Sequence, residues 1–217
     1  MDFERELDLA LPPGLPNRDR VLTVTARHLR LIDGVNEHMN LTRITGPREA
    51  VIKHVVDSVA PWQLFRGAVM VMDAGTGAGF PGIPLAAVLP DTQFVLVDAT
   101  QKKARFVETA VAELGLQNVE VVAERAEDVL RRYRVDVVTA RAVAPLERAL
   151  GYFAAALQQN ARALLYKGPD VDGEMRDARI EATRRRVRMD VVMRYDLPDG
   201  FGARTIVQVA RMTQAAR

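Results

Sequence analysis

Residues 69–82 combine an apolar run, a carboxylate and a glycine-rich turn. The apolar run predicts a buried strand that ends at Asp73. Three glycines follow at alternate positions: Gly75, Gly77 and Gly79. Glycine turns sharply and lets a ligand approach the backbone, because it has no Cβ. Pro81 suits the first turn of a helix, where its missing N–H is not needed. A strand, a glycine turn and a helix N-terminus together predict a site for a nucleotide cofactor.

The spacing of the glycines distinguishes between two classes of cofactor. A dinucleotide-binding turn has the pattern G-x-G-x-x-G, which would need a glycine where this chain has Phe80. The Asp-x-Gly-x-Gly-x-Gly pattern that starts at Asp73 instead resembles the S-adenosylmethionine-dependent methyltransferases. A second carboxylate, Asp98, ends the next apolar run, about 20 residues beyond the turn, where it can accept hydrogen bonds from both ribose hydroxyls. The alternative is a glycine-rich turn that binds no ligand.

Composition limits the classes of protein and mechanism. A chain of 217 residues with 48% hydrophobic and 27% charged residues predicts one large globular domain, or one domain with an extension. No apolar run is long enough to span a bilayer and the N-terminus lacks a signal-peptide pattern, so we expect a soluble, cytoplasmic protein with no membrane partner. The chain has no cysteine, which excludes disulfides, thiolate metal sites and a cysteine nucleophile. Its three histidines are not spaced like a zinc site, and no bound metal is expected.

The basic residues are nearly all arginine. The net charge is only +2, but arginine supplies 26 of the 30 basic residues. The planar guanidinium suits phosphates and guanine edges. Compositional bias of the genome explains the same excess equally well, so net charge alone does not predict a nucleic-acid partner.

The first third of the chain predicts a helical cap, residues 1–66. The proline-rich segment 11–16 interrupts any early helix, and Asn17 or Asp19 can cap a longer one. Apolar residues then recur at helical spacing from Val21 to Met39, and again over residues 51–59. We expect this cap to pack as one unit with a Rossmann-like domain formed by residues 67–217.

Beyond the cap, apolar runs alternate with helical segments. The runs are Val69–Met72, Phe94–Val97, Val119–Val122, Val135–Val138 and Ala163–Tyr166. This alternation predicts an α/β fold with a parallel sheet covered on both faces. Residues 187–195 and 205–212 flank a turn and predict a closing antiparallel pair. Ligands bind outside the carboxyl ends of such strands, so the residues after each run are candidates. They are Asp73–Gly79, Asp98, Ala123–Asp128, Thr139–Arg141 and Lys167-Gly168.

Motifs along nearly the whole chain, from about residue 18, match one family. They are Asn40-Leu-Thr42, Lys53-His54 with Asp57-Ser58, Asp73 to Pro84, Arg125-Ala-Glu-Asp128, Arg141-Ala142 and Lys167-Gly168. In this order they closely resemble the bacterial small-subunit ribosomal RNA guanine-N(7) methyltransferases, the RsmG or glucose-inhibited division protein B (GidB) family. The Gly-Phe-Pro-Gly-Ile-Pro end of the glycine segment is specific to that family. The segment 33–39 departs from it, because it lacks the usual Trp-Asn and aromatic residue.

The resemblance implies a fold, a reaction and a set of contacts. The fold is that of a class I S-adenosylmethionine-dependent methyltransferase: a mostly parallel seven-stranded sheet with helices on both faces and an N-terminal helical extension. The reaction methylates N7 of a specific guanosine in 16S ribosomal RNA, free or in the small ribosomal subunit, and releases S-adenosylhomocysteine. By motif match, Gly75, Phe80, Ala126, Glu127 and Arg141 lie in the cofactor pocket.

The chemistry of N7 limits the roles that side chains must fill. This nitrogen has an in-plane lone pair and no proton, so positioning is sufficient and we name no catalytic acid or base. We expect Asp73 to order the turn or reach the methionine ammonium, Asp98 to hold the ribose, and Glu127 or a nearby amide to hold the adenine. Arg141 is expected to bind the methionine carboxylate or an RNA phosphate, and Lys167 a phosphate.

Other candidate contacts are less specific. Lys53, His54, Asp57 and Ser58 share one side of a helix. They could close over the cofactor or bind RNA, but the leading expectation is a solvated polar face. Phe80 is the best candidate for stacking on the guanine. The arginines at 184–186 and 188 are the densest basic run and could bind RNA.

The sequence leaves three alternatives open. The chain could be a methyltransferase of a small molecule or a protein. It could also be a non-catalytic RNA-binding or assembly protein that keeps the fold. A nicotinamide oxidoreductase is disfavoured by Phe80. We expect a monomer.

Overall fold

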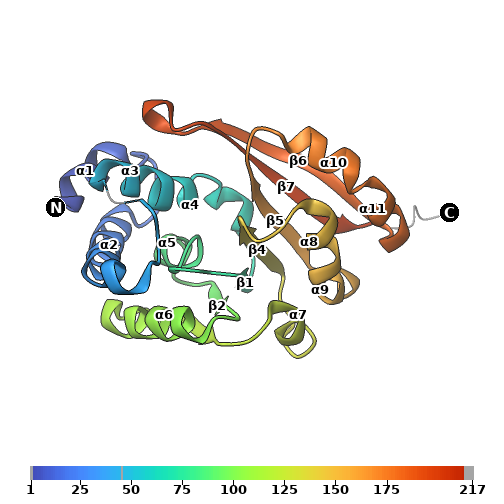
Figure 1. The fold of residues 1–217 in the computed structure, drawn as a ribbon, viewed down its shortest axis with the longest axis horizontal. Coiled ribbons are helices and arrows are strands. Elements are labelled where there is room, and N and C mark those ends of the chain that lie inside the picture. Colours follow the sequence, from blue (N-terminus) through green and yellow to red (C-terminus); the bar gives the residue numbers. More distant parts are fainter. Residues whose placement is uncertain (1, 45, 213–217) are drawn as a thin grey trace.

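A mixed seven-stranded sheet forms the centre of the protein (Figure 1). The computed structural model describes residues 2–44 and 46–212. The strands are β1 (Met70–Ala74), β2 (Gln93–Val97), β3 (Val119–Val122), β4 (Val137–Arg141), β5 (Arg162–Lys167), β6 (Val187–Asp196) and β7 (Ala203–Arg211). Their order is β3-β2-β1-β4-β5-β7-β6. Strands β1 to β5 pair in parallel, whereas β7 runs antiparallel to both β5 and β6. The predicted parallel sheet and closing antiparallel pair are both confirmed.

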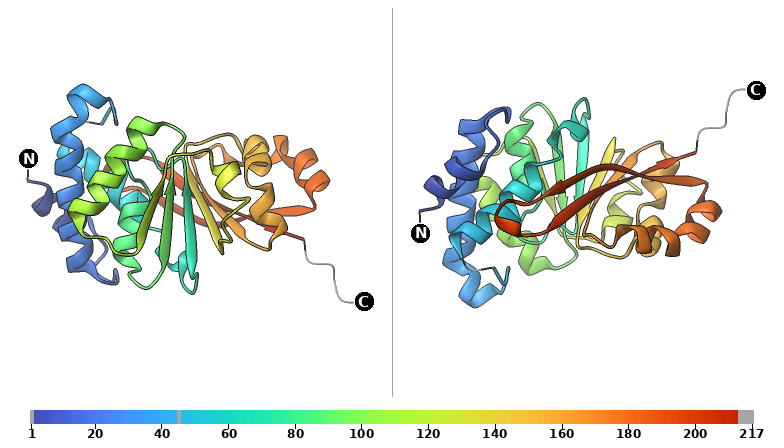
Figure 2. Two further views of the ribbon diagram at one scale, coloured as in Figure 1. Left: turned by 90° about the horizontal axis from the view of Figure 1, so that it is seen from below. Right: turned by 90° about the horizontal axis from the view of Figure 1, so that it is seen from above.

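Helices cover both faces of this sheet (Figure 2). Successive strand residues point to opposite faces. Val71, Phe94 and Leu96 pack into one core with α1 (Phe3–Ala10), α2 (Arg18–Met39), α5 (Gly82–Val88) and α6 (Gln101–Leu114). Met72 and Val95 pack into the other core, with α7 (Ala126–Val129), α8 (Leu146–Tyr152), α9 (Ala154–Gln158), α10 (Val171–Asp177) and α11 (Arg179–Arg185). Because the strands are buried on both faces, they read as continuous apolar runs.

The remaining helical turns are short. They are α3 (Pro47–Ala50), the π-helical η1 (Val51–Val56), α4 (Asp57–Val59), and the 3-10 turns η2 (Trp62–Phe65) and η3 (Pro198–Gly200). The segments α3, η1 and α4 follow one another directly, so a single helical rod carries the predicted second apolar face. No helix in the described part of the chain is both long and apolar enough to cross a membrane.

Two local predictions were wrong. Asn17 precedes α2 but makes no side-chain cap; its amide instead donates to Val88 O at 2.9 Å and joins α2 to α5. Strand β4 begins at Val137, two residues later than the apolar run. Asp136, just before it, accepts hydrogen bonds through Oδ2 from the backbone N–H groups of Val69 and Met70.

The close packing of α5 on the sheet gives a testable prediction. A Cβ added at Gly82 would lie 2.2 Å from Leu96 Cδ2 and 2.9 Å from Asp73 Oδ2. We expect Gly82→Ala to lower the free energy of unfolding by about 1–3 kcal/mol, measured by urea denaturation.

Gly34 provides the matched control. It lies within α2, and a Cβ there would meet nothing within 4 Å. Gly34→Ala should therefore raise stability by about 0.5–1 kcal/mol, because alanine favours the helix. Equal effects of the two substitutions would contradict this packing.

Candidate active site

The loop that follows β1 is held by one carboxylate. Asp73 is buried, and its Oδ2 accepts hydrogen bonds from Thr76 Oγ1 at 2.7 Å and from Gly82 N at 2.9 Å. These bonds join the strand, the turn and the start of α5. The three glycines of the turn have positive φ values of 72°, 63° and 99°, at Gly75, Gly77 and Gly79 respectively. Only glycine adopts these conformations without strain. We call residues 73–82 the glycine loop.

The glycine loop has the features of a site for a charged ligand. A Cβ at Gly77 would meet only Gly75 O, at 3.9 Å, so the space beside this backbone is open. Asp73 Oδ1 is buried and makes no hydrogen bond with the described residues. Burial raises the pKa of Asp73 to about 6. A ligand that donates a hydrogen bond to Oδ1, or that carries positive charge, would therefore satisfy the carboxylate.

Two further predicted contacts lie at the same edge of the sheet. Asp98 follows β2; its Oδ2 accepts from Gly77 N at 3.0 Å and its Oδ1 from Thr100 N at 2.8 Å. A carboxylate has about four acceptor positions, so it can still accept from a diol. Ala126 and Glu127 form the first turn of α7 after β3, and both are partly exposed.

Phe80 does not have the predicted stacking role. Phe80 is 5% exposed, and its ring packs against His54 and His28, with centroid distances of 4.7 and 4.8 Å. The Arg141 guanidinium also lies over this ring, 5.6 Å from its centroid, so the ring is not available to stack on a guanine. The prediction was wrong because the sequence places Phe80 beside the loop but does not show which helices cover it.

Both imidazoles are neutral near pH 7. Burial lowers the pKa of His28 to about 4, and burial together with the positive charge of Arg141 lowers that of His54 to about 3. His28 Nε2 donates to Ala78 O at 2.8 Å, and His54 Nε2 lies 3.0 Å from Thr42 Oγ1. The stack thus fixes the glycine loop to α2 and η1 without adding positive charge.

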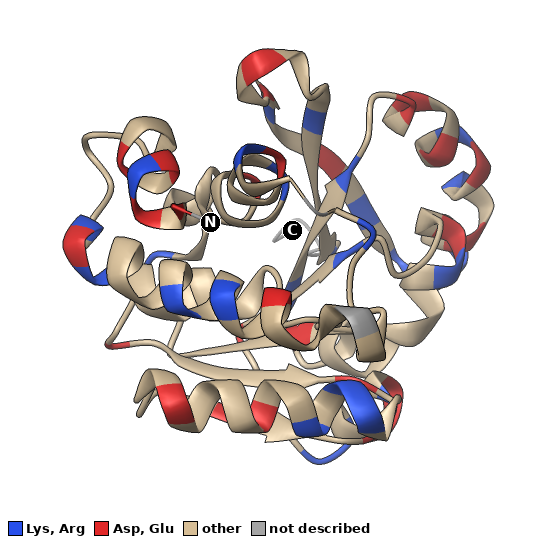
Figure 3. Cartoon of the chain, turned by 60° about the vertical axis from the view of Figure 1, so that its left-hand side comes forward, with Lys and Arg blue, Asp and Glu red and all other residues tan. Residues whose placement is uncertain are grey.

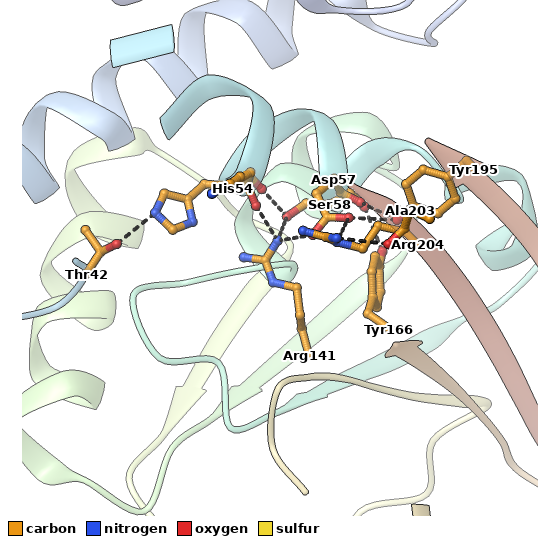
Figure 4. Close-up of polar contacts among 10 residues, drawn as sticks. Thr42, His54, Asp57, Ser58, Arg141, Tyr166, Tyr195, Ala203 and Arg204 are labelled. Atoms are coloured by element: carbon orange, nitrogen blue, oxygen red, sulfur yellow. Dashed lines mark hydrogen bonds and ion pairs between the residues drawn. The ribbon is translucent and has the colours of Figure 1, made fainter. Parts of the chain in front are cut away.

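A buried ion-pair network joins the helical rod to the sheet (Figure 4). Asp57 is 2% exposed. Arg141 Nη1 lies 3.0 Å from its Oδ2, Arg204 Nε lies 3.5 Å from its Oδ1, and the Tyr195 hydroxyl donates to Oδ1 at 2.8 Å. Burial, followed by the negative charge of Asp57, raises the pKa of Tyr195 well above its usual range, so the hydroxyl remains a donor. The Tyr166 hydroxyl donates to Ser58 O at 2.7 Å and completes the network.

This network overturns the prediction of a solvated polar face. Asp57 and Ser58 are buried, and Lys53 and His54 are partly buried. Arg141 also donates to Lys53 O at 2.9 Å, a backbone oxygen in the π-helical turn, where Asp57 N bonds to Ile52 O. Helical spacing correctly placed the four residues on one side, but it could not show that a strand end and a β-hairpin cover that side.

The predicted phosphate contact of Lys167 is not supported by its surroundings. Its side chain is 10% exposed, and Nζ donates to Ala144 O and pairs with Glu174 Oε2, both at 2.7 Å. Glu174 also accepts from Leu146 N at 2.9 Å. Lys167 therefore holds the segment after β4 in place, and its charge is neutralised by Glu174.

A cavity of about 640 Å³ opens beside the glycine loop, at the carboxyl ends of β4 and β5. We call it the β4–β5 cavity. Lys53, His54 and Asp57 line it from the rod, and the strand-end segments 141–145 and 166–168, with Ile44, Glu174 and Arg204, form the rest. Val143 separates it from the loop: a Cβ at Gly75 would lie 2.7 Å from Val143 Cγ2. Ala142, just before Val143, has a φ of 55°, a strained value that turns the chain beside the loop.

The structure thus brings the predicted residues into two adjoining places. Asp73, the three glycines and Asp98 form the loop site, with Ala126 and Glu127 at the same edge, while Arg141 and Lys167 border the cavity. Sequence reasoning missed Tyr195 and Arg204, which reach the site from the β6–β7 hairpin. Their positions in the sequence do not predict this, because the antiparallel strands β6 and β7 bring them back to the site. Among the described residues, no three histidine, aspartate or glutamate side chains come together as a metal site.

Comparison with known proteins identifies the family. Residues 23–197 match the family GidB, described as rRNA small subunit methyltransferase G. This chain belongs to that family. It is 62% identical to the ribosomal RNA small subunit methyltransferase G of Solibacter usitatus, over 96% of this chain and 100% of that protein. Identity to the protein of the same name from Carboxydothermus hydrogenoformans is 38%, over 89% of this chain and 85% of that one.

Solved structures of other methyltransferases share the fold of this chain at low sequence identity. An O-methyltransferase from Bacillus cereus, in complex with S-adenosylhomocysteine, has a TM-score of 0.61 at 20% identity, covering 86% of this chain and 91% of its own. TomG from Streptomyces achromogenes, in complex with S-adenosylmethionine, has a TM-score of 0.57 at 21% identity, covering 85% and 89%. The predicted family and the predicted class I methyltransferase fold are therefore confirmed.

The Asp57 network predicts a large effect of a small substitution. Asp57→Asn keeps the shape of the side chain but leaves the Arg141 and Arg204 guanidinium groups without their shared anion. We expect the free energy of unfolding, measured in urea, to fall by about 3 kcal/mol.

Asp199→Asn is the control for this substitution. Asp199 pairs with Arg48 at 2.7 Å but is 45% exposed, so solvent screens the pair and stability should hardly change. If the two variants were equally stable, the Asp57 network would not be what holds the helical rod on the sheet.

Proposed function

We propose that this protein transfers a methyl group from S-adenosylmethionine to N7 of one guanosine in 16S ribosomal RNA. Membership of the rRNA small subunit methyltransferase G family carries this proposal. The open glycine loop, with its unpartnered buried carboxylate oxygen, supports the choice of cofactor. The family match and the intact loop also weigh against a small-molecule or protein methyltransferase and against a non-catalytic binding protein.

We assign the cofactor contacts to residues of the loop and of the neighbouring strand ends. In this proposal Asp98 holds the ribose hydroxyls and Asp73 Oδ1 the methionine ammonium. The backbone at Gly75, Gly77 and Gly79 would let the cofactor approach closely, and Ala126 with Glu127 would contact the adenine, as the family motif implies. Phe80, which packs against His28 and His54, would support the loop rather than stack on the substrate. Arg141 is assigned to the boundary between loop and cavity, where Asp57 neutralises it.

Bound S-adenosylmethionine supplies a methyl group on a sulfonium sulfur, and its transfer leaves S-adenosylhomocysteine and a positively charged purine. N7 needs no general base, so the task of the chain is to position the purine and accommodate its charge. The β4–β5 cavity is large enough for a base and adjoins the loop. Neutral His54 adds no positive charge to the cavity wall, and Asp57 pairs with Arg141 there.

The form of the substrate is also part of the proposal. We propose that the substrate is 16S rRNA, free or within the small ribosomal subunit, and that the protein acts on it in the cytoplasm as a monomer. The proposed reaction converts one guanosine of 16S rRNA into 7-methylguanosine.

Transfer of the methyl group can be measured directly. Purified protein, labelled S-adenosylmethionine and small subunits from cells lacking this protein should yield one labelled 7-methylguanosine in 16S rRNA, located by nuclease mapping and mass spectrometry. Gly77→Val should lose this activity, because its Cβ occupies the open face of the loop and its φ is unfavourable. Label at another base or in protein would contradict the proposal.

The raised pKa of Asp73 predicts proton release on cofactor binding. The folded pKa of about 6 exceeds the usual value of 3.8, so the contribution of Asp73 to stability is present below pH 3.8 and is lost as the pH rises through 6. An ammonium beside Oδ1 would lower this pKa. S-adenosylhomocysteine should therefore release about half a proton per site at pH 6 and almost none at pH 8.

Calorimetry in two buffers of different ionisation enthalpy measures this release. Asp73→Asn should bind without releasing a proton at either pH. Release that persists in this variant would show that another group titrates.

A further inference from the structure

A second hollow lies at the other end of the strands from the site described above. It has a volume of about 470 Å³ and is bordered by the end of α9, the end of α11, the start of β6 and the end of β7. Four arginines line it: Arg184, Arg185, Arg186 and Arg211. We call it the arginine hollow. Neither the glycine loop nor the β4–β5 cavity shares a residue with it.

The arginines of the hollow carry more positive charge than nearby carboxylates neutralise. Glu181 pairs with Arg184 Nε at 3.3 Å and with Arg185 Nε at 2.5 Å. Arg211 Nη1 donates to the backbone oxygen of Gln158 at 3.4 Å, which leaves its charge in place. Among the described residues, Glu181 is the one carboxylate that pairs with any of these four arginines, and it contacts two of them. Arg184 keeps 72% of its side chain exposed despite the contact with Glu181.

This excess is local rather than general. The whole chain carries a net charge of only +2, and Figure 3 shows basic and acidic residues mixed along the helices. Many other arginines have their own carboxylate, as Arg132 has Glu124 and Arg194 has Asp172. General enrichment in arginine explains the residue type, but it does not explain why four of them surround one hollow.

Backbone conformation adds to the argument. Arg186 ends α11 with a φ of 56°, a left-handed conformation in which glycine would be favoured. The chain carries an arginine there at some cost in strain. Its backbone oxygen accepts from Met212 N at 2.9 Å, which brings the ends of α11 and β7 together around the hollow.

We propose that the arginine hollow binds backbone phosphates of the ribosomal RNA, at a place separate from the methylated guanosine. Guanidinium groups bind phosphate oxygens in pairs of parallel hydrogen bonds, which suits a site built from arginine rather than lysine. Strand β5 runs from this end of the sheet to the β4–β5 cavity and has six residues, so the two places are about 20 Å apart. A folded RNA can contact both. This inference rests on the proposed rRNA substrate and assigns it a second contact.

The test removes two charges without disturbing the fold. Arg186→Gly suits the left-handed backbone, and Arg184→Gln keeps a long polar side chain; the two are combined. The control combines Arg5→Gln and Arg20→Gln, two exposed arginines of α1 and α2 with the same change in charge. Dissociation constants for 16S rRNA and for small subunits are measured by filter binding over a series of salt concentrations.

Each lost phosphate contact should weaken binding roughly fivefold at 0.15 M salt and reduce the slope of log K against log salt by about 0.7–0.9. The double variant should therefore bind roughly 10- to 30-fold more weakly, with a higher KM and an unchanged kcat at saturating RNA. Its affinity for S-adenosylhomocysteine should equal that of the wild type.

The outcomes separate the two proposals. Wild-type affinity and salt slope in the Arg184→Gln/Arg186→Gly variant would overturn the arginine hollow as an RNA contact, even if methylation of rRNA is confirmed. Equal weakening in the Arg5→Gln/Arg20→Gln control would also overturn it, since the effect would then be one of net charge alone. Failure of the wild type to methylate rRNA would instead refute the proposed function, on which this inference depends.

Discussion

Burial of a single carboxylate, that of Asp57, constrains the arrangement of the site. An isolated buried charge is costly, so Asp57 is stable only while Arg141 and Arg204 lie beside it. These partners come from the end of β4 and from β7, on two different parts of the sheet. The requirement for compensation therefore fixes the helical rod against the sheet, and with it one wall of the β4–β5 cavity.

Asp73 has the same role in the neighbouring site. It holds the glycine loop between β1 and α5 through two hydrogen bonds from Oδ2, while Oδ1 remains without a partner. The stack of His28, Phe80 and His54 connects this loop to the rod. Loop and cavity are thus linked by packing and by neutral imidazoles, so a cofactor and a base could be held side by side.

The fold could be predicted closely from the sequence, because the determining signals are local. Buried parallel strands appear as apolar runs, and the glycines with Asp73 and Asp98 lie at strand ends, where the chain order alone places them together. The cap could be predicted as helical but not in its contacts. Its polar side is buried by Arg141 and Arg204, which are far away in the sequence, and helical spacing cannot distinguish solvent from such partners. Phe80 was misassigned for the same reason, because His28 and His54 of the cap cover it. Lys167 was misassigned because its place at a strand end does not show that Glu174 pairs with it. The division into residues 1–66 and 67–217 remains a prediction.

The central claim is that the glycine loop and the β4–β5 cavity are two halves of one active site. A crystal structure of the complex with S-adenosylhomocysteine tests it most directly. We expect the ribose on Asp98, the amino acid part beside Asp73, and the sulfur facing the cavity past Val143. Binding of the ligand away from the glycine loop, or with its sulfur turned from the cavity, would show that the loop and the cavity do not form one site.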